Sequence, residues 1–150
     1  MEVKHSPLIY KDFLVLDFQL ETIESKQNEA FLMEDIPLEI NFEILKKSNE
    51  NDIFNIALNV VGNNVKEPKP GYKFSIIVNG IFSLSPIDRI DKSKIDQYLS
   101  FSALPMVISS VRLFLANLTS YCAFGKYWLP AIDLQDLVKK KATNQINSSR

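Results

Sequence analysis

Apolar residues alternate with polar ones in four separate segments, and this alternation limits the fold more than any other feature of the chain. The clearest segment is 36–44, in which every second residue is apolar: Ile36, Leu38, Ile40, Phe42 and Ile44. Successive side chains of a β-strand point to opposite faces, so this spacing predicts a strand that is covered on one face. Pro37 cannot donate a ladder hydrogen bond and should mark the strand's beginning or an edge.

The other alternating segments are 14–21, 54–60 and 72–84. In the first of them the expected apolar face consists of Leu14, Leu16, Phe18 and Leu20. The polar stretch 47–52 has the composition of a turn, so the strands on either side of it should form an antiparallel hairpin. The last segment passes through Asn79-Gly80 in phase, which favours one long strand with a bulge or kink at Gly80 over a tight turn there.

After Pro86 the spacing of apolar residues becomes helical. Ser93 is the expected cap of a short first helix, and a main helix over 105–121 follows. Its apolar stripe is broad enough to be buried against a sheet and a second surface together: Val107, Ile108, Val111, Phe114, Leu115, Leu118 and Tyr121. Gly125 is a stop signal, and Asp133 is the expected N-cap of the last helix.

Four strands followed by two helices predict an α+β fold, with a four-stranded antiparallel sheet and two C-terminal helices packed on one face. One domain should cover residues 1–142, and the polar tail 143–150 should be disordered. The three lysines 139–141 are expected at a solvated helix end, where cations complement the helix dipole.

Composition excludes several classes of function. The 17 basic and 18 acidic residues give a net charge of −1, which provides no broad attraction for nucleic acid. Cys122 is the sole cysteine, so an intrachain disulfide is excluded and a reducing cytoplasm is the expected location. The apolar segment 101–118 carries Arg112 and therefore fits a core or an oligomer interface better than a membrane.

Residues suited to catalysis are scattered. His5 is the only histidine, and Cys122 lies at the C-terminal end of its helix, whereas a reactive thiol is expected at a helix N-terminus or beside a cation. Asp88, Asp91 and Asp96 flank a helix start, where carboxylates act as stabilising charges. The sequence therefore predicts neither an enzyme nor a metal or other cofactor. The aromatic loop 123–130 instead favours binding, because aromatic side chains offer large contact areas.

Three motifs resemble the SecB family of bacterial export chaperones. They are Asn79-Gly80-Ile81-Phe82-Ser83-Leu84, then Leu104-Pro105 with Arg112 two turns later, and Leu129-Pro130-Ala131-Ile132-Asp133-Leu134. The resemblance covers about residues 14–138. It implies an ATP-independent holdase for unfolded or preprotein-like clients in protein export, assembled as a homotetramer. The implied interface residues lie on the main helix: Val107, Val111, Phe114 and Leu118.

The resemblance also implies a client groove between the loops 22–35 and 123–130. Its expected residues are apolar or aromatic: Phe31, Leu32, Met33, Ile36, Phe124, Tyr127, Trp128 and Leu129. Family members use sheet carboxylates to engage the motor SecA, but Ser75 stands where such an acid is expected. The substitutes for motor docking are Glu24, Glu39 and Glu43. Two alternatives stay open, namely a dedicated chaperone of one antitoxin and a non-chaperone interaction domain on the same fold.

Overall fold

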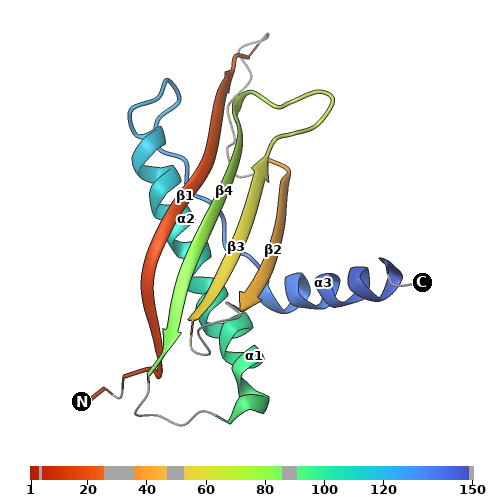
Figure 1. The fold of residues 1–150 in the computed structure, drawn as a ribbon. Coiled ribbons are helices and arrows are strands. Elements are labelled where there is room, and N and C mark those ends of the chain that lie inside the picture. Colours follow the sequence, from red (N-terminus) through yellow and green to blue (C-terminus); the bar gives the residue numbers. More distant parts are fainter. Residues whose placement is uncertain (4, 26–35, 47–52, 86–90, 149–150) are drawn as a thin grey trace.

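One antiparallel sheet forms the centre of the protein. The computed structural model describes residues 1–3, 5–25, 36–46, 53–85 and 91–148. Its four strands have the spatial order β1-β4-β3-β2, with these bounds: β1 (Leu8–Ile23), β2 (Leu38–Lys46), β3 (Ile53–Gly62) and β4 (Gly71–Leu84). The helical elements follow in the chain: η2 (Lys92–Lys94), α1 (Ile95–Tyr98), η3 (Leu99–Ala103), α2 (Leu104–Thr119) and α3 (Leu134–Ser148). The predicted α+β fold is confirmed (Figure 1).

The predicted hairpin of β2 and β3 is also present, and its register is unbroken from Leu38 opposite Gly62 to Lys46 opposite Phe54. Strand β4 continues through Asn79-Gly80 without interruption, as its alternation indicates. It has no bulge at Gly80, where its pairing with β3 is continuous. Glycine is needed there for another reason: an added Cβ would lie 2.3 Å from Cγ2 of Val107 on α2. Gly80 thus lets the helix approach the sheet closely.

The apolar face of strand β1 differs from the one that the sequence predicts. Its register with β4 shifts twice, between Tyr10 and Asp12 and again between Val15 and Asp17. Each extra residue reverses which side chains face the helices. The face predicted from Leu14 to Leu20 is therefore correct only for Phe18 and Leu20, which lie opposite the buried Ile76 and Phe74. Leu14 and Leu16 are exposed.

The core lies between the sheet and α2. The buried residues of this helix are Leu104, Val107, Ile108, Val111, Leu115, Ala116 and Thr119. Phe114 meets Phe18 of β1 edge to face, with ring centroids 5.3 Å apart. By length and hydropathy alone the helical run Ile95–Thr119 could cross a membrane. Its buried stripe packs against the sheet, however, as in a core helix.

The two helices predicted before residue 121 are one continuous helical run, because η2, α1, η3 and α2 follow one another without a break. Its first turn is capped by Asp91 rather than by Ser93. The Asp91 carboxylate accepts a hydrogen bond from the backbone N–H of Ser93 at 3.2 Å. The backbone carbonyl of Asp91 accepts one from the backbone N–H of Lys94 at 2.8 Å. A carboxylate suits this position because the N–H groups of a first turn lack helical partners.

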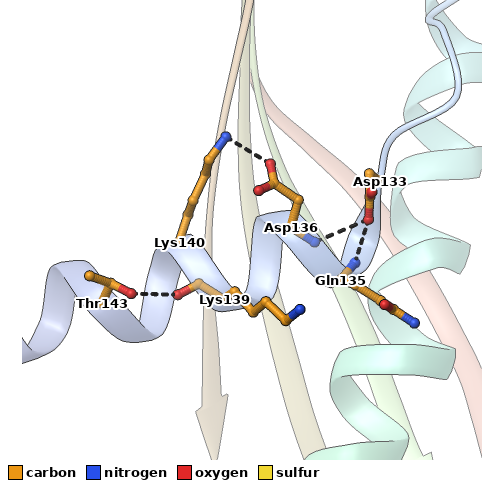
Figure 2. A network of polar contacts seen from close by, with 6 residues as sticks. All are labelled: Asp133, Gln135, Asp136, Lys139, Lys140 and Thr143. Carbon is orange, nitrogen blue, oxygen red and sulfur yellow. Dashed lines mark hydrogen bonds and ion pairs between the residues drawn. The ribbon is translucent and has the colours of Figure 1, made fainter.

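Helix α3 begins where the sequence predicts. The Asp133 carboxylate accepts the backbone N–H groups of Gln135 and Asp136, both at 3.0 Å (Figure 2). The helix then continues to Ser148, so the predicted disorder of the tail is wrong for residues 143–148. An ion pair of 2.7 Å between Lys140 and Asp136, one turn apart, stabilises the helix. Its first turns pack on the core, and its remainder projects past β2 (Figure 1).

Candidate functional site

The aromatic loop after α2 is held by hydrogen bonds from both the sheet and the helix. The hydroxyl of Tyr72 on β4 donates to the carbonyl of Gly125 at 2.8 Å and accepts the N–H of Phe124 at 3.0 Å. On α2, the Thr119 hydroxyl donates to Leu115 at 2.6 Å and accepts the N–H of Tyr127 at 2.8 Å. These contacts fix the loop's backbone and with it the directions of its side chains.

Most of the loop's apolar side chains point into the core rather than toward a client. Tyr127 is 1% exposed and Leu129 is 2% exposed. The ring of Tyr127 lies 5.4 Å from that of Phe74, and burial raises the pKa of its hydroxyl to about 12. Phe124 is half-buried against Tyr72. Among the aromatic side chains of the loop, only Trp128 is largely exposed, at 55%, with the Lys126 ammonium 5.5 Å from its ring centroid. As free contact surface, this loop therefore offers chiefly Trp128.

The other predicted client residues divide in two. Ile36 is 6% exposed and belongs to the core, so it offers little surface for a client. Phe31, Leu32 and Met33 lie outside the described residues.

The assignment of four α2 residues to an oligomer interface needs revision for two of them. Val107 and Val111 have no exposed surface in the single chain, because they are buried against its own sheet. Phe114 and Leu118 are half-buried. The large apolar side chains that this helical run leaves exposed are Phe101, Met106 and Leu113.

The three carboxylates considered for motor docking do not form one cluster. Glu39 and Glu43 lie on the same face of β2, opposite Val61 and Ala57 of β3. Glu24 follows the end of β1, which is the other edge of the sheet. Three strand spacings separate the two edges, or about 14 Å.

A groove that the sequence did not reveal lies along the outer edge of β2. We call it the β2–α3 groove; its volume is about 400 Å³ and its lining residues are Phe42, Glu43, Ile44, Leu45, Asp96, Ser100, Val138, Lys141 and Ala142. The β2 part of the lining is four consecutive residues, whose side chains alternate between the two faces, and the neighbouring strand β3 contributes none. The groove therefore lies beside the strand's main chain, between α3 and the start of the long helical run.

Lys141 connects the two walls of this groove. Its ammonium donates to Oδ1 of Asn41 at 3.0 Å and lies 5.8 Å from the ring centroid of Phe42. The sequence interpretation of Lys141 as part of a solvated helix end is wrong, because α3 continues beyond it. The sequence did contain a usable signal: Lys141 follows Leu134, Leu137 and Val138 at helical spacing, on the side that packs on the core.

Within the described residues, no three His, Cys, Asp or Glu side chains gather as a metal site would require. The Cys122 thiol is half-buried and lies 3.6 Å from the Leu118 carbonyl. The β2–α3 groove instead combines an apolar wall, two carboxylates and the main chain of an edge strand. These groups suit contact with an extended polypeptide.

Comparison with known proteins supports a SecB-like α+β fold. No protein-family model matches the chain, and no curated protein does. Among solved structures, the SecB-like chaperone Rv1957 of Mycobacterium tuberculosis, in complex with a ChAD peptide from the HigA1 antitoxin, matches at a TM-score of 0.53. The identity is 11%, over 85% of this chain and 91% of that one. The chain therefore has a SecB-like fold.

A second solved structure is a protein of unknown function from Streptococcus agalactiae, with a TM-score of 0.49 and 10% identity. The match covers 83% of this chain and 97% of that one.

Proposed function

We propose that this protein is a SecB-like chaperone that holds extended, unfolded polypeptide segments without ATP. The observation that carries the proposal is the β2–α3 groove, which places apolar side chains beside the main chain of an edge strand. The fold is shared with a SecB-like chaperone in complex with a peptide, which supports a peptide as the ligand here. The protein acts by binding, so the proposal includes neither an enzymatic step nor a cofactor.

The groove can hold a client by burying its apolar side chains. The accessible apolar residues of the lining are Ile44, Leu45, Val138 and Ala142, whereas Phe42 is 6% exposed and belongs to the core. Burial of one client leucine or phenylalanine contributes about 1.5–3 kcal/mol before the entropy of ordering is subtracted. Trp128 supplies a separate exposed aromatic contact on its fixed loop. Weak contacts spread over a long client give useful affinity without strict sequence specificity.

Assembly as a homotetramer in the cytoplasm belongs to the same proposal. Met106 and Leu113 lie seven residues apart on α2 and are exposed, at 38% and 59%. A separation of seven residues places them on one side of the helix. The apolar stripe of α2 is broader than contact with one sheet requires. Burial of these two residues against another copy of the chain would account for the extra breadth. Export through SecA would use Glu39 and Glu43, which share the open face of β2.

A dedicated chaperone of one antitoxin is the second candidate. It is favoured by one observation, the antitoxin peptide in the complex of the Mycobacterium tuberculosis neighbour. A toxin–antitoxin pair encoded beside this gene would support the dedicated role, and an isolated gene would argue against it. A non-chaperone interaction domain would differ from both kinds of chaperone because it would not bind an unfolded client.

The decisive experiment measures mass by light scattering with and without reduced, carboxymethylated α-lactalbumin, a permanently unfolded client. We expect a complex with the client and suppression of the aggregation of a heat-unfolded protein at stoichiometric ratio. Trp128→Ala should weaken both effects and leave the oligomer intact. If the purified protein forms no complex and suppresses no aggregation, the chaperone proposal is wrong. Loss of the oligomer in the variant, with no effect on the client, would favour the interaction domain.

A further inference from the structure

We propose that Tyr72 and Asn63 are positioning residues for client binding: together they hold the turn that precedes Trp128, so that its exposed ring meets a client in a fixed orientation. The inference rests on the proposed function, in which Trp128 supplies an aromatic contact. It adds two buried residues that act through the loop and touch no client themselves. Preorganisation of this kind improves affinity, because less motion is lost on binding.

Trp128 is an exposed ring on a main chain that is held on both sides. Before it, the N–H of the buried Tyr127 donates to the Thr119 hydroxyl at 2.8 Å. After it, the carbonyl of the buried Leu129 accepts from Nε of Arg112 at 2.7 Å. The exposed part of an aromatic ring adds no burial to the fold, whereas a fixed direction favours contact with a ligand.

The hydroxyl of Tyr72 holds the turn before these residues. Tyr72 lies near the start of β4 and has no exposed surface. Its hydroxyl donates to the Gly125 carbonyl at 2.8 Å and accepts the Phe124 N–H at 3.0 Å, so one atom contacts two peptide groups of the same turn. Lys126 follows Gly125 directly, and its ammonium lies 5.5 Å from the Trp128 ring centroid. A shift of the Gly125 carbonyl would therefore move the cation beside the ring.

Asn63 holds Tyr72 in turn. Asn63 is fully buried, and its Nδ2 donates to the carbonyls of Tyr72 at 3.1 Å and Lys69 at 2.8 Å. Its Oδ1 accepts the N–H of Lys69 at 2.9 Å, and its own backbone N–H donates to the Pro37 carbonyl at 2.8 Å. These bonds join the start of β4 to the segment after β3 and to the residue before β2.

The backbone of Asn63 indicates that its side chain is what the position requires. Its φ is +60°, in the left-handed region, and within the described part of the chain it is the one residue other than glycine with a positive φ. Glycine adopts this region without the steric cost that a side chain adds. Backbone freedom alone would thus be met best by glycine, and the three hydrogen bonds of the amide group account for asparagine.

Two tyrosines provide a matched comparison. Tyr72→Phe removes the hydroxyl that holds the turn, whereas Tyr10→Phe removes a hydroxyl 2.9 Å from Ser110 Oγ, at the other end of β4. Client binding is measured by fluorescence anisotropy with the full chain and labelled, reduced and carboxymethylated α-lactalbumin. We expect Tyr72→Phe to bind about threefold to tenfold more weakly, because mobile side chains must then be ordered on binding. Tyr10→Phe should bind within about twofold of the wild type.

A local measurement separates positioning from a general loss of stability. Hydrogen exchange of the Phe124 amide, followed by NMR, reports whether the turn opens. In Tyr72→Phe this amide should exchange about threefold to tenfold faster, because it loses the hydroxyl as an acceptor. In Tyr10→Phe its exchange rate should stay within about twofold of the wild-type rate.

Neighbouring asparagines test the second positioning residue. Asn63→Gly keeps the left-handed backbone accessible and removes the three side-chain hydrogen bonds, whereas Asn64→Gly changes the adjacent exposed residue. We expect Asn63→Gly to weaken client binding about threefold. Asn64→Gly should change it less than about twofold. Because Asn63 acts through Tyr72, the double variant Asn63→Gly/Tyr72→Phe should lose less affinity than the product of the two single effects.

The outcomes separate this inference from the proposed function. If the wild type binds the client and Tyr72→Phe binds it equally well, or if both tyrosine variants lose affinity alike, positioning by Tyr72 is wrong and the chaperone proposal stands. Fully multiplicative effects in the double variant would contradict the role of Asn63. If the wild type binds no client, the chaperone proposal fails and this inference fails with it. Selective loss in Tyr72→Phe, together with faster exchange at Phe124, supports the inference.

Discussion

Arg112 of α2 fixes the position of Leu129 through a hydrogen bond of 2.7 Å from its Nε–H to the Leu129 carbonyl. The same guanidinium donates from Nη2 to the carbonyl of Pro130 at 3.0 Å. One side chain thereby joins the main helix to the segment that leads into α3. The planar fork of arginine can donate to two neighbouring carbonyls at once, whereas lysine presents a single ammonium.

Replacing this arginine should loosen the loop in a graded manner. We expect Arg112→Met to lower the free energy of unfolding by about 1.5–3 kcal/mol, the range for hydrogen bonds to a charged group. Arg112→Lys should fall between Arg112→Met and the wild type, because it can keep one of the two contacts. Urea unfolding followed by circular dichroism measures both. Equal stability of wild type and Arg112→Met would show that the two carbonyls do not depend on the guanidinium.

The contact between Gly80 and Val107 makes a second prediction. Gly80→Ala should cost about 1–3 kcal/mol, because the new methyl group overlaps the Val107 side chain. Adding Val107→Ala provides room, so the double variant should be more stable than the sum of the two single changes by at least about 1 kcal/mol. Thermal or urea unfolding of all four proteins completes the cycle. Simple additivity would contradict the close approach.

The buried hydroxyl of Tyr127 predicts an unusual response to substitution. It has no hydrogen-bond partner within the described residues, so Tyr127→Phe should leave stability at pH 7 unchanged or raise it by about 1 kcal/mol. Destabilisation by more than that amount in urea unfolding would indicate that the hydroxyl is satisfied.

The Tyr127 hydroxyl should also make the stability of the protein depend on pH in the alkaline range. Burial raises the pKa of Tyr127 to about 12, whereas an unfolded tyrosine titrates near about 10. Below pH 10 both states keep the proton; between pH 10 and 12 the unfolded state loses it first, so stability falls as pH rises. The contribution is less than about 2.7 kcal/mol, the value for two pH units before solvent screening. Tyr127→Phe should lose less stability over this interval than the wild type.

The neighbouring residues Trp128 and Leu129 should respond in opposite ways. Leu129 is buried, and Leu129→Ala should cost about 2–5 kcal/mol. Trp128→Ala should change stability by less than about 0.5 kcal/mol but weaken client binding. Unfolding curves and anisotropy with a labelled client measure the two effects. A large loss of stability in Trp128→Ala would place its ring in the core.

Assembly should depend on the exposed side of α2. Leu113→Asp should convert the proposed tetramer to smaller species in light scattering, because a buried, unpaired carboxylate costs several kcal/mol. The fold of the single chain should persist, since Leu113 is 59% exposed. Gln135→Glu, at an exposed position of α3 rather than of α2, is the charge-matched control. An unchanged mass for Leu113→Asp would remove this side of α2 from any interface.

The parts of the fold that sequence predicts well depend on local spacing. The hairpin of β2 and β3 follows from alternation around a polar turn, and the α3 cap follows from Asp133 and the apolar run behind it. The face of β1 fails because its two register shifts arise from pairing with β4, which is distant in sequence. Local alternation around Leu14 and Leu16 cannot report an insertion that only the partner strand defines.

The candidate site shows the same limit. An aromatic loop rich in Phe124, Tyr127 and Trp128 has the composition of a binding surface, yet its exposure is decided by hydrogen bonds from Tyr72 and Arg112, elsewhere in the chain. The β2–α3 groove was missed because it requires two facts that no local pattern contains. One is that β2 lies at the edge of the sheet, and the other is that α3 passes beside it.

The exposed ring on the fixed loop also provides a measurement that needs no label. Trp128 is the sole tryptophan of the chain, so the intrinsic emission of the protein above 300 nm comes mainly from one site. Its segment is joined to α2 through Arg112 and to β4 through Tyr72, and a shift of the helix against the sheet would change the ring's surroundings. The wavelength of emission and its quenching by iodide therefore report client contact and movement of the helix, in the unmodified protein and in real time.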